Sequence, residues 1–309
     1  MLGHRCLESL LEVPDVEVVG ILTSRESFSI SYSREPVTNV LHTDFHRLSN
    51  SHHIPLWSME RSMDESGLKD KVFATRPDVM FVAGWYHMIP RSWREDVPAY
   101  ALHASLLPRY RGGAPLVWAI INGERETGVT LFEMDDGVDT GPILAQSAIR
   151  IGPLETIASL LEKVEEHSLS LVKESFRAFL AGDLRPLAQT GPQTEQMSQR
   201  TPEDGRIDFS KNIRYVDRFI RAQTHPYPGA FFDFEGSRIR VWSAMAAPDF
   251  DRVPLPGLIQ YAGGNFYFAC LDGWMQGLEC ERSGSGLGGG MAHPLSSSLI
   301  YPQSLDCVP

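Results

Sequence analysis

Apolar residues follow two different spacings along the first half of the chain. Residues 6–13 are apolar at helical spacing, whereas residues 16–24 and 76–85 are continuous apolar runs typical of buried strands. Residues 128–151 predict two short strands around an acidic, glycine-rich turn, and residues 156–182 predict a long helix with a glycine at its end. Strands that alternate with helices predict an α/β fold with a doubly wound, mostly parallel, Rossmann-like sheet.

Two stretches of this domain depart from the regular pattern. Residues 25–53 show no clean period, which predicts a long loop. A domain of this kind normally opens with a buried strand, but here the helical pattern begins almost at Met1. We therefore expect either that the first strand is missing or that the fold compensates for it, and we expect the first domain to span residues 1–182.

The composition and periodicity of the sequence change after this domain. Residues 183–204 are polar and contain prolines, so they are expected to form a linker. Residues 205–280 contain short apolar runs that suit a small C-terminal β-barrel, OB-like in type. Residues 281–309 are rich in glycine and serine without a core-forming period, so the tail is expected to be disordered.

The composition is that of an ordinary globular protein, with 42% hydrophobic and 22% charged residues. The sequence has neither an apolar run of about 18 residues nor a recognisable secretory signal, so we expect a cytoplasmic protein without a membrane partner. The four cysteines form no CxxC pair, which favours reduced thiols over a metal site.

Acidic residues outnumber basic ones, with 39 Asp and Glu against 28 Lys and Arg and a net charge of -11. Residues 24–47 carry three cations and three anions, and residues 200–309 carry 10 cations and 12 anions. Proteins that bind nucleic acid usually present a basic face, so a nucleic acid partner is disfavoured.

Three motifs carry the chemistry: LHASLLPRYRGGAP at residues 102–115, NGERETGVTLFEMDDGVDTG at residues 122–141, and HPYPGAF at residues 225–231. Together they resemble the 10-formyltetrahydrofolate-dependent formyltransferase family, in the branch that holds methionyl-tRNA formyltransferases and amino-sugar nucleotide N-formyltransferases. The resemblance covers roughly residues 3–270. It implies 10-formyltetrahydrofolate as the formyl donor and no metal ion.

The resemblance assigns the catalytic residues. The family motif is Asn-x-His followed by Ser-Leu-Leu-Pro, with an Asp before Thr-Gly downstream; His103 and Asp139 match it, and Ala101 occupies the Asn position. An isolated histidine is more often structural, but within this motif catalysis is favoured. His103 would stabilise an oxyanion and shuttle protons, while Asp139 would orient its ring. Loss of an oxyanion donor typically lowers the rate by about 10²–10³, so Ala101 predicts an impaired enzyme, an altered chain or a natural binder.

The resemblance also implies the binding residues. The pterin of the folate would contact three segments: the backbone of Trp85, Tyr86 and His87; Ser105, Leu106, Leu107 and Pro108; and the backbone of Asp135, Asp136, Gly137, Val138 and Asp139. The side chains of Asp135 and Asp136 are expected to be solvated turn carboxylates, and a purely structural turn stays open for Leu107 and Pro108. Arg109 and Arg111 are candidates for binding an anionic substrate, with a surface role equally open. His42, His46, His52 and His53 superficially resemble a metal cluster, but without matching acids or thiols solvated loop residues are favoured.

The charge balance favours one of the two substrates of the branch, a nucleotide-linked amino sugar or methionyl-tRNA. A nucleotide-linked amino sugar needs only local contacts, whereas tRNA demands cations, so we favour the amino sugar. Two alternatives stay open: methionyl-tRNA formylation, and an inactive relative that binds folate or a nucleotide sugar. A homodimer is also left open.

Overall fold

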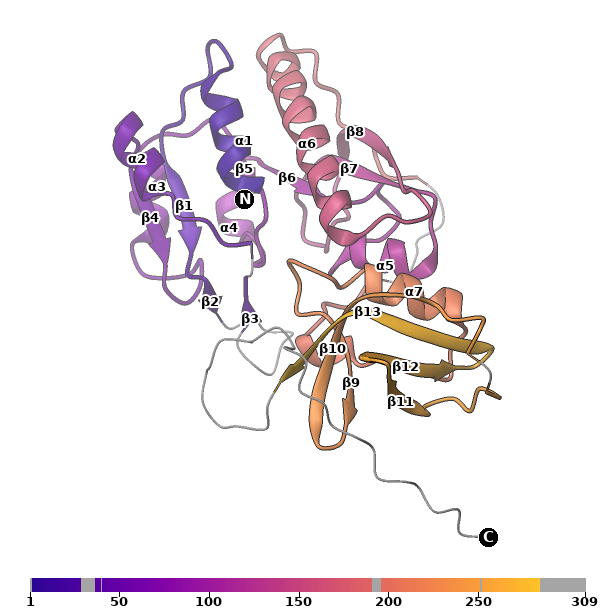
Figure 1. The fold of residues 1–309 in the computed structure, drawn as a ribbon. Helices are drawn as coiled ribbons and strands as arrows, with labels where there is room; N and C mark the ends of the chain where they lie inside the picture. The colour runs from indigo at the N-terminus through magenta and orange to yellow at the C-terminus, as the bar shows by residue number, and fades with distance from the viewer. Residues whose placement is uncertain (1, 29–36, 40, 191–195, 251, 284–309) are drawn as a thin grey trace. The chain divides into compact units, whose positions relative to one another are not determined.

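The computed structural model describes residues 2–28, 37–39, 41–190, 196–250 and 252–283. The chain divides into two compact units, unit 1 (Met1–Thr201) and unit 2 (Pro202–Pro309) (Figure 1). Unit 1 contains, in chain order, α1 (Leu2–Leu11), β1 (Ile21–Ser24), β2 (Ser27–Phe28), β3 (Val37–Thr38), α2 (His46–His52), β4 (Leu56–Met59), α3 (Leu68–Phe73), β5 (Met80–Val82), α4 (Arg91–Arg94), β6 (Ala99–His103), α5 (Pro115–Asn122), β7 (Glu126–Glu133), β8 (Ile143–Arg150) and α6 (Ile157–Leu180).

Unit 1 is an α/β domain, which confirms the predicted fold class. β1 and β4 form a parallel pair, and a second sheet has the strand order β5-β6-β7-β8. β5 and β6 are parallel, whereas β7 is antiparallel to both β6 and β8. The connection from β6 to β7 contains α5, whereas a direct loop reverses the chain between β7 and β8. Within the described residues, β1 and β5 share no ladder, and α1 is the first element.

Strand β6 separates two faces of unit 1. Leu102 packs against the cluster that α1 and α6 build from Cys6, Leu10, Val172 and Phe176, and Tyr100 contacts Phe179 edge-on. Alternate residues of a strand point to opposite faces. Ala99, Ala101 and His103 are all buried on the other face, away from α1 and α6.

The long loop predicted over residues 25–53 is partly wrong, since this stretch contains β2, β3 and α2. Helix α2 was missed because HRLSNSH contains a single apolar residue, Leu48, so no amphipathic period is visible. The long helix predicted at residues 156–182 is confirmed as α6. It ends at Ala181, and Gly182 follows with φ +72°.

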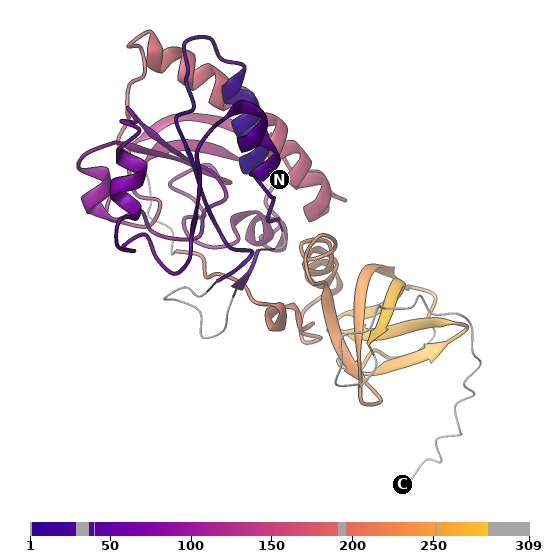
Figure 2. The same cartoon turned by 90° about the vertical axis from the view of Figure 1, so that its left-hand side faces the viewer.

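Unit 2 begins with a 3₁₀ turn (Pro202–Gly205) and contains α7 (Ile213–Arg221), β9 (Ala230–Phe234), β10 (Ser237–Ala246), β11 (Ile259–Ala262), β12 (Asn265–Cys270) and β13 (Gly273–Ser283). Its strands form an antiparallel, curled sheet in the order β11-β12-β13-β10-β9 (Figure 2). β9 and β11 are the edges of this sheet among the described residues, so the expected barrel is a half-barrel. Phe209, Phe232 and Phe268 meet in its core.

The segment predicted to be a linker lies along unit 1 as far as the described residues show. The backbone of Leu187 exchanges hydrogen bonds with Ile143, and Met197 bonds to Arg111 and Gly113. The boundary between the units falls after Thr201. Of the tail predicted at residues 281–309, β13 includes residues 281–283, and residues 284–309 lie outside the described residues. The described helices include none long and apolar enough to cross a bilayer.

Candidate active site

His103 lies at the end of β6 and is 9% exposed. Its Nε2 is 2.7 Å from the carbonyl oxygen of Tyr110, and its Nδ1 is 3.4 Å from Oδ2 of Asp139. Both neighbours are hydrogen-bond acceptors, so each ring nitrogen faces an oxygen of the protein. The structure therefore brings together the two residues predicted to be catalytic.

Asp139 is held by its backbone as well as by its side chain. Its Oδ2 accepts a 2.7 Å hydrogen bond from the backbone N–H of Gly112, and its carbonyl accepts a 2.8 Å bond from Nε2 of Gln189. Asp139 also has a φ of +54°, a conformation that non-glycine residues adopt only where their surroundings impose it. The loop that connects β7 to β8 is thus fixed at the residue facing His103.

Ala101 lies on the same face of β6 as His103 and is 6% exposed. It belongs to an apolar cluster with Leu107 and Phe132. Its methyl group offers no donor to a developing oxyanion, as the sequence indicated. The strand geometry directs position 101 and His103 to one side of the sheet.

Polar side chains of β7 and β8 hold the segment from Ser105 to Pro108. Thr130, fully buried on β7, donates to the carbonyl of Ser105 at 2.6 Å and accepts from the backbone N–H of Leu107 at 3.2 Å. Gln146 on β8 donates to the carbonyl of Leu107 at 2.9 Å. These bonds satisfy backbone groups that a loop would otherwise leave to water.

Sequence reasoning missed Thr130 and Gln146. For Thr130 the available signal was a polar residue inside a run of buried strand residues, a position that usually needs a hydrogen-bond partner. Gln146 is exposed on β8 and offered no such signal. Leu106, in the same segment, packs over β7, since a Cβ on Gly128 would lie 2.4 Å from Cδ2 of Leu106.

The segment Trp85 to His87 follows β5 and contains two polar atoms without partners. Phe28 contacts the rings of Tyr86 and His87, with centroid distances of 5.4 and 5.0 Å. Among the described residues, the buried Nε1 of Trp85 and Nε2 of His87 have no hydrogen-bond partner. Burial lowers the pKa of the His87 imidazole, which favours its neutral form. Buried polar atoms are usually paired, so this segment is suited to a ligand that has both acceptors and donors.

The acidic turn after β7 is closed by its own side chains. Oδ1 of Asp135 accepts from the backbone N–H of Gly137 at 3.0 Å and from the Thr140 hydroxyl at 2.5 Å. Val138 is 37% exposed at the tip of the turn. Asp135, Gly137 and Val138 therefore lie on one compact turn that leads into Asp139.

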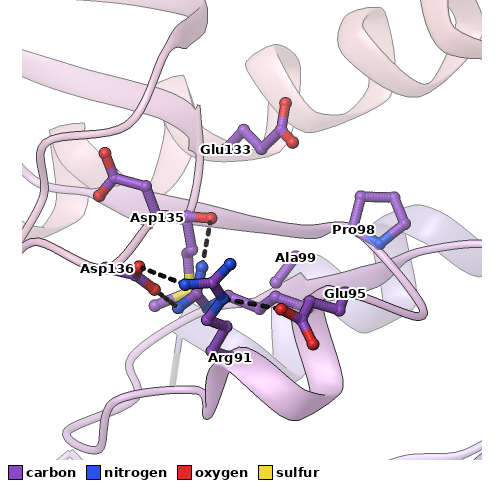
Figure 3. Close-up of a pocket in the computed structure, with 9 residues that line it drawn as sticks. Arg91, Glu95, Pro98, Ala99, Glu133, Asp135 and Asp136 are labelled. Atoms are coloured by element: carbon purple, nitrogen blue, oxygen red, sulfur yellow. Dashed lines mark hydrogen bonds and ion pairs between the residues drawn. The ribbon is translucent and has the colours of Figure 1, made fainter.

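Arg94 of α4 anchors this turn from outside. Its Nη2 donates to Oδ1 of Asp136 at 2.5 Å, and its Nε donates to the carbonyl of Ile89 at 2.9 Å. The Asp136 carboxylate faces the arginines, whereas those of Glu133 and Asp135 point away from them (Figure 3). The ion pair with Arg94 holds the pKa of Asp136 below its usual range.

A pocket of about 290 Å³ lies at this anchor and is lined by Arg91, Arg94, Glu95, Pro98, Ala99, Glu133, Met134, Asp135 and Asp136. His103 and Asp139 are not part of its lining. Its arginines already pair with carboxylates of the same chain, at 2.7 Å for Arg91 and Glu95. These ion pairs therefore hold the acidic turn against α4.

Both candidate substrate-binding arginines contact protein groups. Nη2 of Arg109 is 2.6 Å from Oε1 of Glu124, which also accepts from the hydroxyl of Tyr110. Arg111 is 9% exposed and donates to Oε1 of Gln189 from Nη2 at 2.6 Å and from Nε at 3.1 Å. Within the described part of the chain, no three His, Cys, Asp or Glu side chains gather to hold a metal ion.

Two family models match most of the chain. Residues 11–174 match the formyl transferase domain, and residues 200–286 match the formyl transferase C-terminal domain. The chain therefore belongs to the formyltransferase family. This result confirms the resemblance carried by the three sequence motifs.

Two curated relatives are similar over most of the chain. The methionyl-tRNA formyltransferase of Acidobacterium capsulatum is 32% identical over 235 residues, 75% of each chain, and that of Myxococcus xanthus is 35% identical over 232 residues, 72% of this chain and 74% of the relative.

Solved structures share the fold at lower identity. The N-formyltransferase of Helicobacter canadensis in complex with folinic acid and dTDP-3-aminofucose matches with a TM-score of 0.62 at 17% identity, covering 89% of this chain and 95% of that one. HypX of Aquifex aeolicus in complex with tetrahydrofolic acid matches with a TM-score of 0.60 at 21% identity, covering 86% and 44%.

Proposed function

We propose that this chain binds 10-formyltetrahydrofolate and transfers its formyl group to the amine of a nucleotide-linked amino sugar. The folate would lie along three segments, Trp85 to His87, Ser105 to Pro108 and Asp135 to Asp139. The unpartnered buried nitrogens of Trp85 and His87 support this fit, because a pterin ring carries both acceptors and donors. The hydrogen-bonded backbone from Ser105 to Pro108 supplies a rigid wall.

The folate supplies an activated formyl group attached to a nitrogen that leaves as an amine. His103 would take the proton that the acceptor amine loses and pass it to the leaving nitrogen, while its Nδ1, 3.4 Å from the Asp139 carboxylate, fixes the orientation of the ring. Asp139 would stabilise the positive charge of His103 while its ring moves that proton. Ala101 adds no donor, so the oxyanion would be stabilised by His103 without help from position 101.

The ion pairs of unit 2 support an amino sugar, rather than tRNA, as the formyl acceptor. Among the described residues of unit 2, six cations lie beside carboxylates at N–O distances of 2.7–3.8 Å: Arg206, Lys211, Arg221, Arg238, Arg240 and Arg282. The carboxylates beside these cations reduce the positive potential that would attract a phosphate backbone, and the whole chain has a net charge of -11. A sugar nucleotide needs only a few local contacts to its diphosphate and base.

Methionyl-tRNA is the second candidate acceptor. The curated relatives named above carry that activity in their names at 32% and 35% identity, a similarity that spans both units. The two candidates differ in salt dependence, because tRNA binding weakens steeply as salt displaces protein cations from phosphates.

The test measures binding and turnover separately. Calorimetry with 5-formyltetrahydrofolate tests the folate site, and release of tetrahydrofolate is then followed with a panel of nucleotide-linked 3- and 4-amino sugars and with initiator methionyl-tRNA. We expect folate binding and turnover with one or more sugars. If only tRNA is formylated, and in a salt-sensitive way, then tRNA and not the sugar is the acceptor. A well-folded protein that does not bind folate would overturn the proposal.

A further inference from the structure

Gln189 connects three parts of unit 1 that meet beside the His103–Asp139 pair. Its Nε2 donates to the carbonyls of Asp139 and Gly141, each at 2.8 Å, and its Oε1 accepts from Arg111. We propose that Gln189 is a positioning residue that sets the Asp139 carboxylate against His103, with Arg111 fixing the orientation of the Gln189 amide. The role of this positioning in the reaction rests on the proposed formyl transfer.

The donors and acceptors around Gln189 allow one amide orientation. Arg111 has donors only, so it must face the amide oxygen, and the two loop carbonyls have acceptors only, so they must face the amide nitrogen. A flipped amide would place donor against donor and acceptor against acceptor. Because Arg111 is buried, at 9% exposed, water is a poor substitute for either partner.

The carbonyls that Gln189 holds belong to a strained stretch of backbone. Asp139 has a φ of +54°, and a Cβ on Gly141 would lie 1.7 Å from the carbonyl oxygen of Glu133. Left-handed backbone at a non-glycine residue persists only when surrounding contacts over-determine it. Gln189 supplies two such contacts on either side of Thr140, and Gly112 supplies a third through the Asp139 carboxylate.

The segment that carries Gln189 is docked by its backbone. The N–H and C=O of Leu187 bond to Ile143 at 2.8 and 2.7 Å, while the Leu187 side chain remains 67% exposed. Ala188 and Thr190 are exposed, whereas Gln189 is half-buried. The side chain of Gln189 is therefore turned into unit 1, and Leu187 offers a matched control because its own side chain contributes little.

Three substitutions separate positioning from packing. Gln189→Glu keeps the shape and a partner for Arg111 but removes the donor to the two carbonyls. Gln189→Leu removes both functions. Leu187→Ala changes the same segment without touching its backbone hydrogen bonds. Circular dichroism and thermal melting of the full chain establish that each variant is folded.

Two readouts are measured on these variants. Hydrogen exchange of the amides in residues 134–142 reports whether the loop is held, and it needs no activity. Turnover is measured in the parent and in an Ala101→Asn background, with kcat and KM determined separately. A misplacement of about 1 Å costs on the order of 10²-fold in rate, so we expect a loss of that size in kcat for Gln189→Glu and Gln189→Leu.

We expect faster exchange of the loop in both Gln189 variants and parent behaviour in Leu187→Ala. Unchanged loop exchange in a folded Gln189→Glu variant would overturn the positioning, as would a fall in kcat shared equally by Leu187→Ala. If neither background turns over any substrate, the proposed function fails; the exchange data then still decide whether Gln189 holds the loop. Faster exchange of the loop with undiminished kcat would show that Gln189 holds the loop but does not affect the reaction.

Discussion

At position 101 we expect the side chain to affect the rate of formyl transfer more than ligand binding. Its methyl group packs with Leu107 and Phe132, so the site has apolar contacts at the place where the family motif has an amide. An amide introduced there would share a face with His103. It would also have to find a hydrogen-bond partner, because a buried polar group without one costs about 1–3 kcal/mol.

We expect Ala101→Asn to raise kcat by about 10²–10³, because the amide acts on charge that develops only in the transition state. Folate and substrate binding should change little. Steady-state kinetics of formyl transfer measures the gain, and unfolding in urea measures any loss of stability. His103→Ala added to Ala101→Asn should abolish the gain; an Asn variant that folds, binds folate and stays inactive would favour a binding protein.

The contribution of Asp136 to folding stability depends on pH. Arg94 lowers its pKa from the ordinary value of 3.8. A carboxyl group whose folded pKa is lowered adds stability that is complete above the unfolded value and is lost as the pH falls through the folded value. The parent should therefore be more stable than Asp136→Asn at neutral pH.

This difference in stability should shrink below about pH 3.8 and close at lower pH, as measured by urea unfolding at a series of pH values. Asp64→Asn is the control, since Asp64 is an exposed carboxylate without an ion pair in the described part of the chain. A difference for Asp136→Asn that persists unchanged in acid would show that the ion pair with Arg94 does not stabilise the fold.

At the scale of elements, α6 and β6 fix the frame of the site. α6 begins with a capping box, in which the Thr156 side chain accepts from the backbone N–H of Ser159 and the Ser159 side chain accepts from that of Thr156. Its inward residues, among them Val172 and Phe176, cover the face of β6 opposite His103. The capping box therefore stabilises the helix that covers this face of β6.

Thr156→Ala should lower the free energy of unfolding by about 0.5–2 kcal/mol, because it leaves a helix N–H without its cap. Urea unfolding measures this loss, and folate binding should be unchanged. Ser170→Ala removes a hydroxyl from the exposed side of the same helix and should cause no comparable loss. Equal effects of the two substitutions would contradict a capping role for Thr156.

At the scale of the whole molecule, the two units have separate cores. Phe268 is fully buried in unit 2 and meets Phe232 at a centroid distance of 5.6 Å. Phe268→Ala should cost about 3–5 kcal/mol in unit 2. Hydrogen exchange should become faster across unit 2 and stay unchanged in unit 1, because regions with separate cores open separately.

Tyr261→Ala is the control for that substitution, since Tyr261 is 41% exposed on an edge strand of the same sheet and its loss should have a smaller effect. Faster exchange throughout unit 1 in the Phe268→Ala variant would show that the units unfold together.

The sequence by itself determined the α/β class, the long helix α6 and the pairing of His103 with Asp139 as catalytic candidates. Apolar periodicity is local, and a family motif is local too, so both can be recognised without coordinates. Helix α2 was missed because its one buried apolar side chain, Leu48, makes no period.

Only the tertiary structure decided which distant residues support the site. Thr130 and Gln146 hold the Ser105–Pro108 segment from two neighbouring strands, and Gln189 reaches the Asp139 loop from 50 residues further along the chain. Their hydrogen bonds depend on how strands and loops pack, which no local pattern encodes. The same packing places Arg111 against Gln189, a partner that the basic motif around it could not reveal.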